Sequence, residues 1–100
     1  MSTKSDATAQ PDLETLNAQV SAGKSLIACC IVDACLIQPT ACQTSALAQM
    51  NRGDCAPVIS NFDFDGCAYN DCGTGSSTVW VKVAARQATG WVKGSCCSFS

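Results

Sequence analysis

The sequence contains no histidine among its 100 residues. Histidine is the side chain most often used as a general base, and it activates many cysteine nucleophiles. It also completes many structural zinc sites. The chain has no Cys-x-x-Cys spacing either, and the four-residue gaps in Cys30/Cys35 and Cys67/Cys72 fit zinc or iron–sulfur patterns only loosely. We therefore expect no enzymatic activity, no metal and no cofactor.

Charged residues are scarce, at 14%, and the net charge is −2. Nucleic-acid binding relies on clustered Lys and Arg, so this composition argues against it. Residues 53–71 carry four acidic side chains and no basic one, whereas residues 73–100 carry three basic and no acidic ones. This asymmetry is compatible with a head-to-tail contact between copies of the chain. We favour an internal balance of solvated charges as its explanation, because surface ion pairs contribute only about 0–1 kcal/mol.

Long apolar segments are also missing. Residues 1–11 are polar, lack the apolar region of a cleaved signal peptide and are predicted to form a flexible tail. The most apolar stretch, residues 26–37, is too short to span a bilayer, which takes about 17–25 residues. We therefore expect no transmembrane segment, and the export route stays open.

Cysteine is abundant, with nine residues in the chain. This proportion is close to that of disulfide scaffolds, and disulfides persist in oxidising compartments. The composition thus favours an extracellular or cell-surface protein. Because nine is odd, one sulfur is left for an intermolecular bond or a reactive thiol, and the connectivity stays open. The disulfide or cross-link candidates are Cys29, Cys30, Cys35, Cys42, Cys55, Cys67, Cys72, Cys96 and Cys97.

Two pairs of adjacent cysteines stand at 29–30 and 96–97. Neighbouring cysteines rarely bond each other, because the ring that they would close is strained. Each pair is therefore expected to reach two different partners. Successive side chains on a strand face opposite sides, so one of Cys96 and Cys97 is expected to face inward and the other outward.

A first helix is predicted to begin near Asp12, whose charge suits the positive end of the helix dipole. Apolar residues recur at steps of three and four over residues 13–37, with Gly23 as a kink or break. Residues 26–37 are apolar on all sides of such a helix except at Asp33. This pattern indicates a helix buried in the core or between subunits, in which Asp33 needs a partner.

A second helix is predicted over residues 41–51, because Thr40 and Gln43 match a capping box. Residues 12–52 would then form a helical hairpin. Residues 57–98 are predicted to be rich in β-structure, and the segment 78–85 is the clearest strand.

Residues 91–98 are predicted to return as a strand antiparallel to residues 78–85, which places Trp80 and Trp91 on facing strands of one hairpin. The fold class predicted for residues 12–100 is therefore a single cysteine-rich α+β domain. Its N-terminal helical hairpin packs on a small antiparallel sheet and is stapled by disulfides.

Two short motifs suggest ligands. Asn61, Asp63 and Asp65, followed by Gly66, match the start of a calcium loop, although a strand with alternating Phe and Asp side chains gives the same letters. Residues 52–54 spell Arg-Gly-Asp, the adhesion tripeptide, although short matches of this kind arise by chance.

Three roles remain for a chain with these properties. The first is a structural protein that self-assembles into homo-oligomers or is cross-linked through disulfides. The second is the precursor of a ribosomally made, bacteriocin-like modified peptide, with residues 12–23 as a helical leader. The third is a small secreted binding or inhibitory module that uses the loop at residues 52–57 or 70–77.

Overall fold

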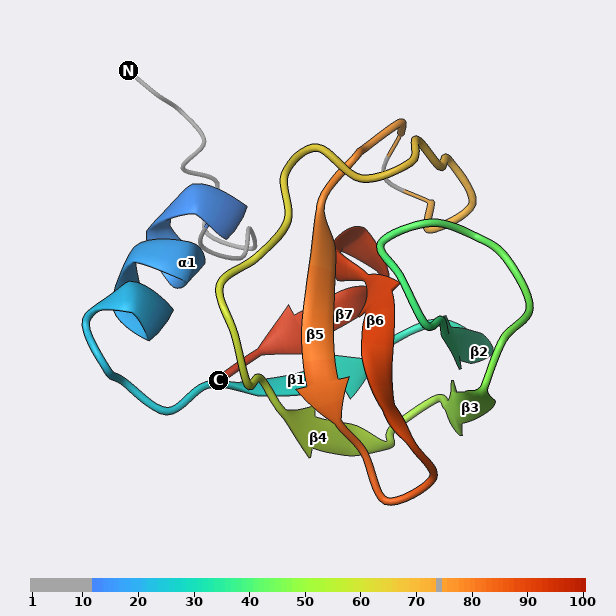
Figure 1. Ribbon diagram of the computed structural model, residues 1–100, viewed down its shortest axis with the longest axis horizontal. Coiled ribbons are helices and arrows are strands. Elements are labelled where there is room, and N and C mark those ends of the chain that lie inside the picture. Colours follow the sequence, from blue (N-terminus) through green and yellow to red (C-terminus); the bar gives the residue numbers. More distant parts are fainter. Residues whose placement is uncertain (1–11, 74) are drawn as a thin grey trace.

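The computed structural model describes residues 12–73 and 75–100, and within them the fold mixes one α-helix with antiparallel strands (Figure 1). The flexible tail predicted for residues 1–11 lies outside the described residues. The elements are α1 (Leu13–Ser21), β1 (Ile27–Cys30), β2 (Ala34–Ile37), β3 (Ala48–Asn51), β4 (Cys55–Pro57), β5 (Trp80–Ala84), β6 (Thr89–Lys93), the 3-10 turn η2 (Gly94–Cys96) and β7 (Cys97–Phe99).

The strands form three small antiparallel sheets, with the orders β4-β1-β7, β2-β3 and β5-β6. The last two sheets are joined where Gln38 and Trp91 exchange backbone hydrogen bonds of 2.7 and 2.8 Å. A Cβ atom at Gly90 would lie 2.5 Å from the Gln38 carbonyl oxygen, so this approach requires glycine. In Figure 1, the β5-β6 hairpin crosses in front of β1 and β7, and α1 lies to one side.

The core lies mainly between these sheets. Trp80 is fully buried, its ring meets Tyr69 edge-to-face at 5.5 Å, and its Nε1 donates to the Cys67 carbonyl oxygen at 2.8 Å. A buried indole N–H needs such an acceptor, because an unpaired one is costly. The other large side chains with almost no exposure are Ile37, Gln38, Met50, Val81, Val83 and Val92.

The start of the first helix is confirmed, but its predicted length is wrong. The Asp12 side chain accepts a hydrogen bond from Thr15 N at 2.8 Å, and α1 ends at Ser21. Gly23 follows with a φ of 88°, a left-handed conformation that suits glycine and ends the helix. The prediction of a break at this glycine is therefore correct, but residues 24–37 do not continue as a helix.

Residues 26–37 form β1, a turn and β2 instead of a buried helix. Burial in β1 alternates strictly, with Ala28 and Cys30 buried and Ile27 and Cys29 half-buried. A short run that is apolar on both strand faces has the same composition as an all-round apolar helix, and periodicity alone does not separate the two. The β-branched residues of this run favour the strand.

The second helix, and with it the helical hairpin over residues 12–52, is also wrong. Residues 41–47 form no helix, and β3 occupies the end of the predicted helix. The backbone N–H of Thr44 bonds the Gln38 side chain at 3.1 Å, and Cys42 is bonded to Cys67. These tertiary links override the local capping pattern.

The predicted β-hairpin is confirmed. Lys82 pairs with Trp91 and Trp80 with Lys93, so the two tryptophans lie on facing strands of β5 and β6. The expectation of one strand over residues 91–98 is wrong, because η2 interrupts it. The chain then continues as β7 in a different sheet.

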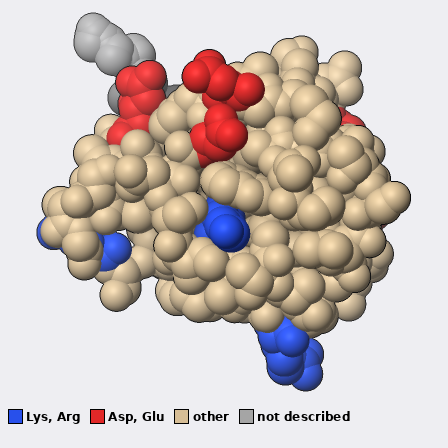
Figure 2. Space-filling model, viewed as in Figure 1, with Lys and Arg blue, Asp and Glu red and all other residues tan. Residues whose placement is uncertain are grey.

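The surface carries few charges. On the face shown in Figure 2, acidic side chains gather near the upper edge, basic ones lie apart from them, and most of the surface is uncharged. Across the described residues, the ion pairs are Arg52–Asp33 at 2.9 Å and Lys93–Asp71 at 2.7 Å. No helix in this part of the chain has the length and apolar character needed to cross a membrane.

Candidate functional site

Eight of the nine cysteines are paired within the chain, and Cys97 is the remaining thiol. The bridges connect segments that are distant in the sequence in three of the four cases, with separations of 24 to 26 residues. The disulfides are Cys29–Cys55, Cys30–Cys35, Cys42–Cys67 and Cys72–Cys96. Four bridges fit an oxidising environment.

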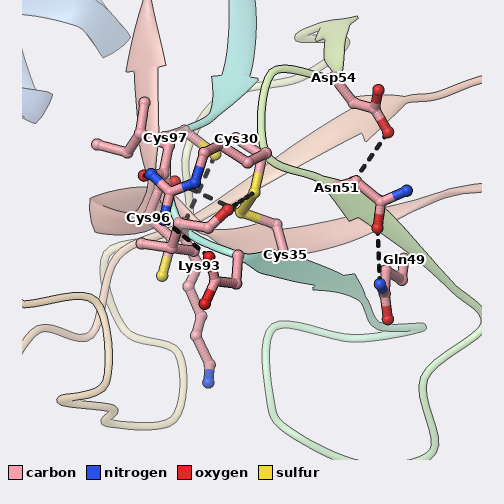
Figure 3. Close-up of a disulfide and its surroundings, with 12 residues drawn as sticks. Cys30, Cys35, Gln49, Asn51, Asp54, Lys93, Cys96 and Cys97 are labelled. Atoms are coloured by element: carbon pink, nitrogen blue, oxygen red, sulfur yellow. Dashed lines mark hydrogen bonds and ion pairs between the residues drawn. A yellow bond between two sulfur atoms is a disulfide. The ribbon is translucent and has the colours of Figure 1, made fainter.

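The first cysteine pair bonds in two directions, as expected for adjacent cysteines. Cys29 joins β1 to Cys55 in β4, where the two residues are direct cross-strand partners with Cα atoms 4.0 Å apart. Cys30 faces the other side of β1 and bonds Cys35 at the start of β2 (Figure 3). One bridge thus lies within the sheet of β1, and the other links that sheet to the β2-β3 sheet.

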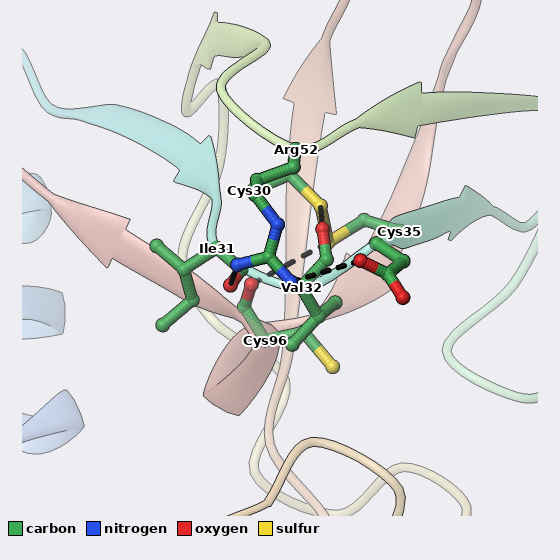
Figure 4. A network of polar contacts seen from close by, with 7 residues as sticks. Cys30, Ile31, Val32, Cys35, Arg52 and Cys96 are labelled. Atoms are coloured by element: carbon green, nitrogen blue, oxygen red, sulfur yellow. Dashed lines mark hydrogen bonds and ion pairs between the residues drawn. A yellow bond between two sulfur atoms is a disulfide. The ribbon is translucent and has the colours of Figure 1, made fainter.

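Arg52 holds the turn that the Cys30–Cys35 bridge closes (Figure 4). Its Nη1 donates to the Ile31 carbonyl oxygen at 2.6 Å, and its Nη2 donates to Asp33 Oδ1 at 2.9 Å. The predicted partner of Asp33 therefore exists, but the carboxylate is exposed and not buried, with a side chain 96% accessible. An ion pair so open to solvent contributes about 0–1 kcal/mol.

Cys96 and Cys97 are both buried, with 3% exposure each, so the expected inward and outward orientations are wrong. Strand alternation does not apply to them, because η2 ends at Cys96 and β7 begins at Cys97. Cys96 bonds Cys72, whereas the Cys97 Sγ lies 3.7 Å from the Lys93 carbonyl oxygen. Burial raises the pKa of the Cys97 thiol to about 12, so it is protonated at neutral pH.

A cleft of about 210 Å³ lies beside these bridges and is lined by Val32, Ala34, Cys35, Leu36, Gln43, Asp71, Lys93 and Cys96. Lys93 Nζ donates to Asp71 Oδ2 at 2.7 Å and lies 5.6 Å from the Tyr69 ring centroid. The hydrogen bond from Lys93 lowers the pKa of the Asp71 carboxyl. This pair was not identified from the sequence, where the two residues are 22 positions apart without a shared motif.

The same region brings together Asp71, Cys72 and Cys96, whose potential ligand atoms lie within 4.8 Å of one another. Metal binding by cysteine requires a thiolate. Both sulfurs belong to one disulfide, so this group offers a single carboxylate in the oxidised protein.

The calcium motif lies in the segment that precedes Gly66. Asn61 Oδ1 accepts from Ser21 Oγ at 3.1 Å, and Asp63 Oδ1 accepts from Asp65 N at 2.8 Å. Phe62 is buried, Asp63 and Phe64 are both half-buried and Asp65 is exposed, so burial does not alternate as the strand interpretation requires. The backbone forms an isolated bridge to Trp80 here and no strand, and calcium binding stays a prediction.

The Arg-Gly-Asp tripeptide forms the turn between β3 and β4, and Gly53 has a φ of 92°. Arg52 is bound to the β1-β2 turn, and Asp54 Oδ2 accepts from Asn51 N at 2.8 Å. Both charged side chains thus stabilise neighbouring turns, which accounts for the motif without an external receptor.

Comparison with known proteins gives no further assignment, since no family model, curated protein or solved structure matches the chain. The function is therefore inferred from the chemistry of the two disulfides that start in β1 and of the cleft beside them.

Proposed function

We propose that this chain is a non-catalytic, disulfide-stapled structural protein that self-associates outside the cell or at the cell surface. The observation that carries the proposal is the combination of four internal bridges with exposed apolar side chains on a sparsely charged surface. The bridges keep the small fold stable, and the apolar side chains provide contact surface for another copy.

The bridges compensate for a small core. A chain of this length buries a limited share of its surface, and each disulfide adds about 2–4 kcal/mol, mainly by restricting the unfolded chain. Cys42–Cys67 supports this role directly, because it ties an otherwise irregular loop to the segment around Trp80. Cross-linking of this kind suits a protein that must stay folded in an oxidising compartment better than one that must move during catalysis.

The exposed apolar residues favour association. Ile31 and Leu36 are 40% and 39% exposed, and Leu36 lines the cleft together with Val32 and Ala34. Apolar side chains that adjoin one another at the surface often mark a protein–protein contact. We therefore place the contact at the β1-β2 turn and the cleft beside it.

Self-association through this surface is non-covalent. Cys97 is the thiol left after pairing, and its 3% exposure prevents a second molecule from reaching it while β7 is in place. The cross-linking role expected for the odd cysteine would require the C-terminal strand to open.

Sedimentation velocity over a range of protein concentrations tests the proposal. The oxidised protein is expected to shift toward larger species as concentration rises, and Leu36→Asp is expected to weaken this shift at least tenfold in dissociation constant. Ile59→Asp is the matched control, because Ile59 is similarly exposed, at 47%, but does not line the cleft. A wild-type protein that stays monomeric at all concentrations would rule out self-association.

The cleft supports a second candidate, a small secreted binding or inhibitory module. It combines apolar walls with the Lys93–Asp71 pair, and ligand sites commonly join an apolar lining to a few polar groups. Affinity capture with the oxidised protein as bait distinguishes the candidates. A single tightly bound partner that Leu36→Asp releases would favour the binding module over self-association.

A further inference from the structure

Cys30 and Cys97 face each other across the β1-β7 pair. Ile27 and Ser100 exchange two backbone hydrogen bonds of 3.0 Å, so they form a hydrogen-bonded pair. Such pairs alternate with non-hydrogen-bonded pairs along an antiparallel ladder. Three positions further along, Cys30 and Cys97 fall at a non-hydrogen-bonded position, where Cα atoms lie about 4.5 Å apart and side chains share one face.

The chain already contains a disulfide at a position of this kind. Cys29 and Cys55 are direct partners across β1-β4, flanked by the Cys30 N to Asp54 O hydrogen bond of 2.9 Å, and they are bonded with Cα atoms 4.0 Å apart. The register places Cys30 and Cys97 in the equivalent relationship on the other side of β1. Disulfides generally accept Cα separations of about 4.4–6.8 Å, which includes the separation expected here.

We propose that Cys30 has two alternative disulfide partners, Cys35 and Cys97, and that the protein converts between the two forms by internal thiol–disulfide exchange. The sulfur atoms of Cys97, Cys30 and Cys35 thus form a relay, and the buried Cys97 thiol is one end of it. Figure 3 shows all three residues gathered where β1, β2 and the start of β7 meet.

The exchange requires no external oxidant or reductant. Cys97 first loses its proton to solvent base, and its thiolate attacks Cys30 Sγ. The Cys30–Cys97 bond forms as the Cys30–Cys35 bond breaks, and Cys35 leaves as a thiolate that takes up a proton. The number of disulfides stays at four and the number of thiols at one.

The exchange moves the thiol to a different surface environment. Cys97 and Cys35 are both 3% exposed, but Cys35 lines the cleft that also contains Lys93 and Leu36, whereas Cys97 lies at the start of β7. The form with Cys30–Cys35 stores the thiol at Cys97, and the form with Cys30–Cys97 moves it to Cys35 in the wall of the cleft. Since the exchange is internal, it does not depend on the proposed self-association, and either can fail alone.

Burial of the Cys97 thiol makes the form with the Cys30–Cys35 bridge persist. The thiolate is the attacking species, and the Cys97 thiol is protonated at neutral pH. Exchange therefore depends on transient exposure of Cys97 to solvent at the start of β7, a strand of three residues.

The variant Cys35→Ser tests the geometry through its thiol count. It retains eight cysteines, the original nine less one. After oxidative folding, the protein is alkylated under denaturing, non-reducing conditions and its intact mass is measured. The proposal expects no alkylated thiol, because Cys30 and Cys97 pair. Two alkylated thiols in a folded variant would overturn it, and Cys35→Ser/Cys97→Ser is the control, expected to retain one.

A measurement on the wild-type chain keeps the test decisive if that variant does not fold. The oxidised protein is incubated at about pH 9 with a low concentration of iodoacetamide, conditions that promote exchange and trap the released thiol. Proteolysis before Asp33 separates Cys30 from Cys35, and tandem mass spectrometry locates the label. Label at Cys35 that is absent from Cys97→Ser supports the relay. Label at Cys97 without any at Cys35 contradicts it.

Discussion

Cys29 and Cys30 are adjacent in the sequence but bond to different sheets, Cys29 to Cys55 in β4 and Cys30 to Cys35 in β2. The alternation of side chains along β1 makes this possible, since successive residues leave opposite faces of a strand. The central strand of one sheet is thereby covalently connected in two directions.

Removal of a partly exposed disulfide should lower the free energy of unfolding less than removal of a buried one, because only the second also disturbs packing. Cys29→Ser/Cys55→Ser opens a 26-residue loop between partly exposed residues, and we expect the free energy of unfolding to fall by about 3 kcal/mol. Cys72→Ser/Cys96→Ser opens a similar 24-residue loop but also disturbs two buried side chains, so its loss should be larger. Urea denaturation measures both, and equal losses would show that burial of the sulfur atoms contributes nothing.

Trp80 should be more sensitive to substitution than Trp91. Trp80→Phe removes the Nε1 hydrogen bond to the Cys67 carbonyl oxygen and leaves space in a fully buried site, so we expect a loss of about 1–3 kcal/mol. Trp91→Phe is the control, because Trp91 is only half-buried. Circular dichroism follows unfolding of both variants, and a larger loss at Trp91 would contradict the assigned core.

Gly90 should not tolerate a side chain. In Gly90→Ala, the new Cβ would lie 2.5 Å from the Gln38 carbonyl oxygen, where β6 meets the end of β2. We expect overpacking to cost about 1–3 kcal/mol. Thermal unfolding provides the measurement, with Ala84→Gly in the neighbouring strand as a control for strand propensity. A Gly90→Ala variant as stable as wild type would mean that the two sheets do not approach this closely.

Alkaline pH should destabilise the protein through Cys97. Burial raises the folded pKa of this thiol to about 12 from an ordinary value of 9.0. The neutral buried thiol therefore contributes stability that is fully present below pH 9.0 and is lost as pH rises toward about 12. The free energy of unfolding should fall by up to about 1.4 kcal/mol per pH unit in this window.

The variant Cys97→Ala isolates this contribution, because it removes the titrating group and leaves the other ionisable residues in place. Its free energy of unfolding should depend less steeply on pH than that of the wild type. Parallel pH dependences for the two proteins would show that Cys97 is not enclosed in the folded state.

The sequence indicates the β-hairpin well because its alternation is local and unambiguous. Val81 and Val83 are buried, and turn residues at 70–77 precede the strand, so the hairpin over residues 80–93 forms as predicted. The start of α1 is equally local, since Asp12 caps the helix by itself. These features require no knowledge of distant contacts.

The N-terminal half was mispredicted because its structure depends on contacts that are remote in sequence. Residues 26–37 are apolar on both strand faces, with β4 and β7 flanking β1 in its sheet and a disulfide formed on each face. The spacing of apolar residues along the sequence cannot reveal such neighbours. The disulfide pairing and the Asp71–Lys93 contact beside the cleft depend on the same three-dimensional arrangement.

The most direct test of this account is the intact mass of the protein under non-reducing conditions, with alkylation before and after denaturation. The account predicts a covalent monomer that lacks two hydrogen atoms for each of four disulfides, with one thiol that is alkylated rapidly only after denaturation. Nine alkylatable thiols, or a covalent ladder, would contradict it. So would a mass below that of the oxidised chain, which would instead favour a modified peptide precursor.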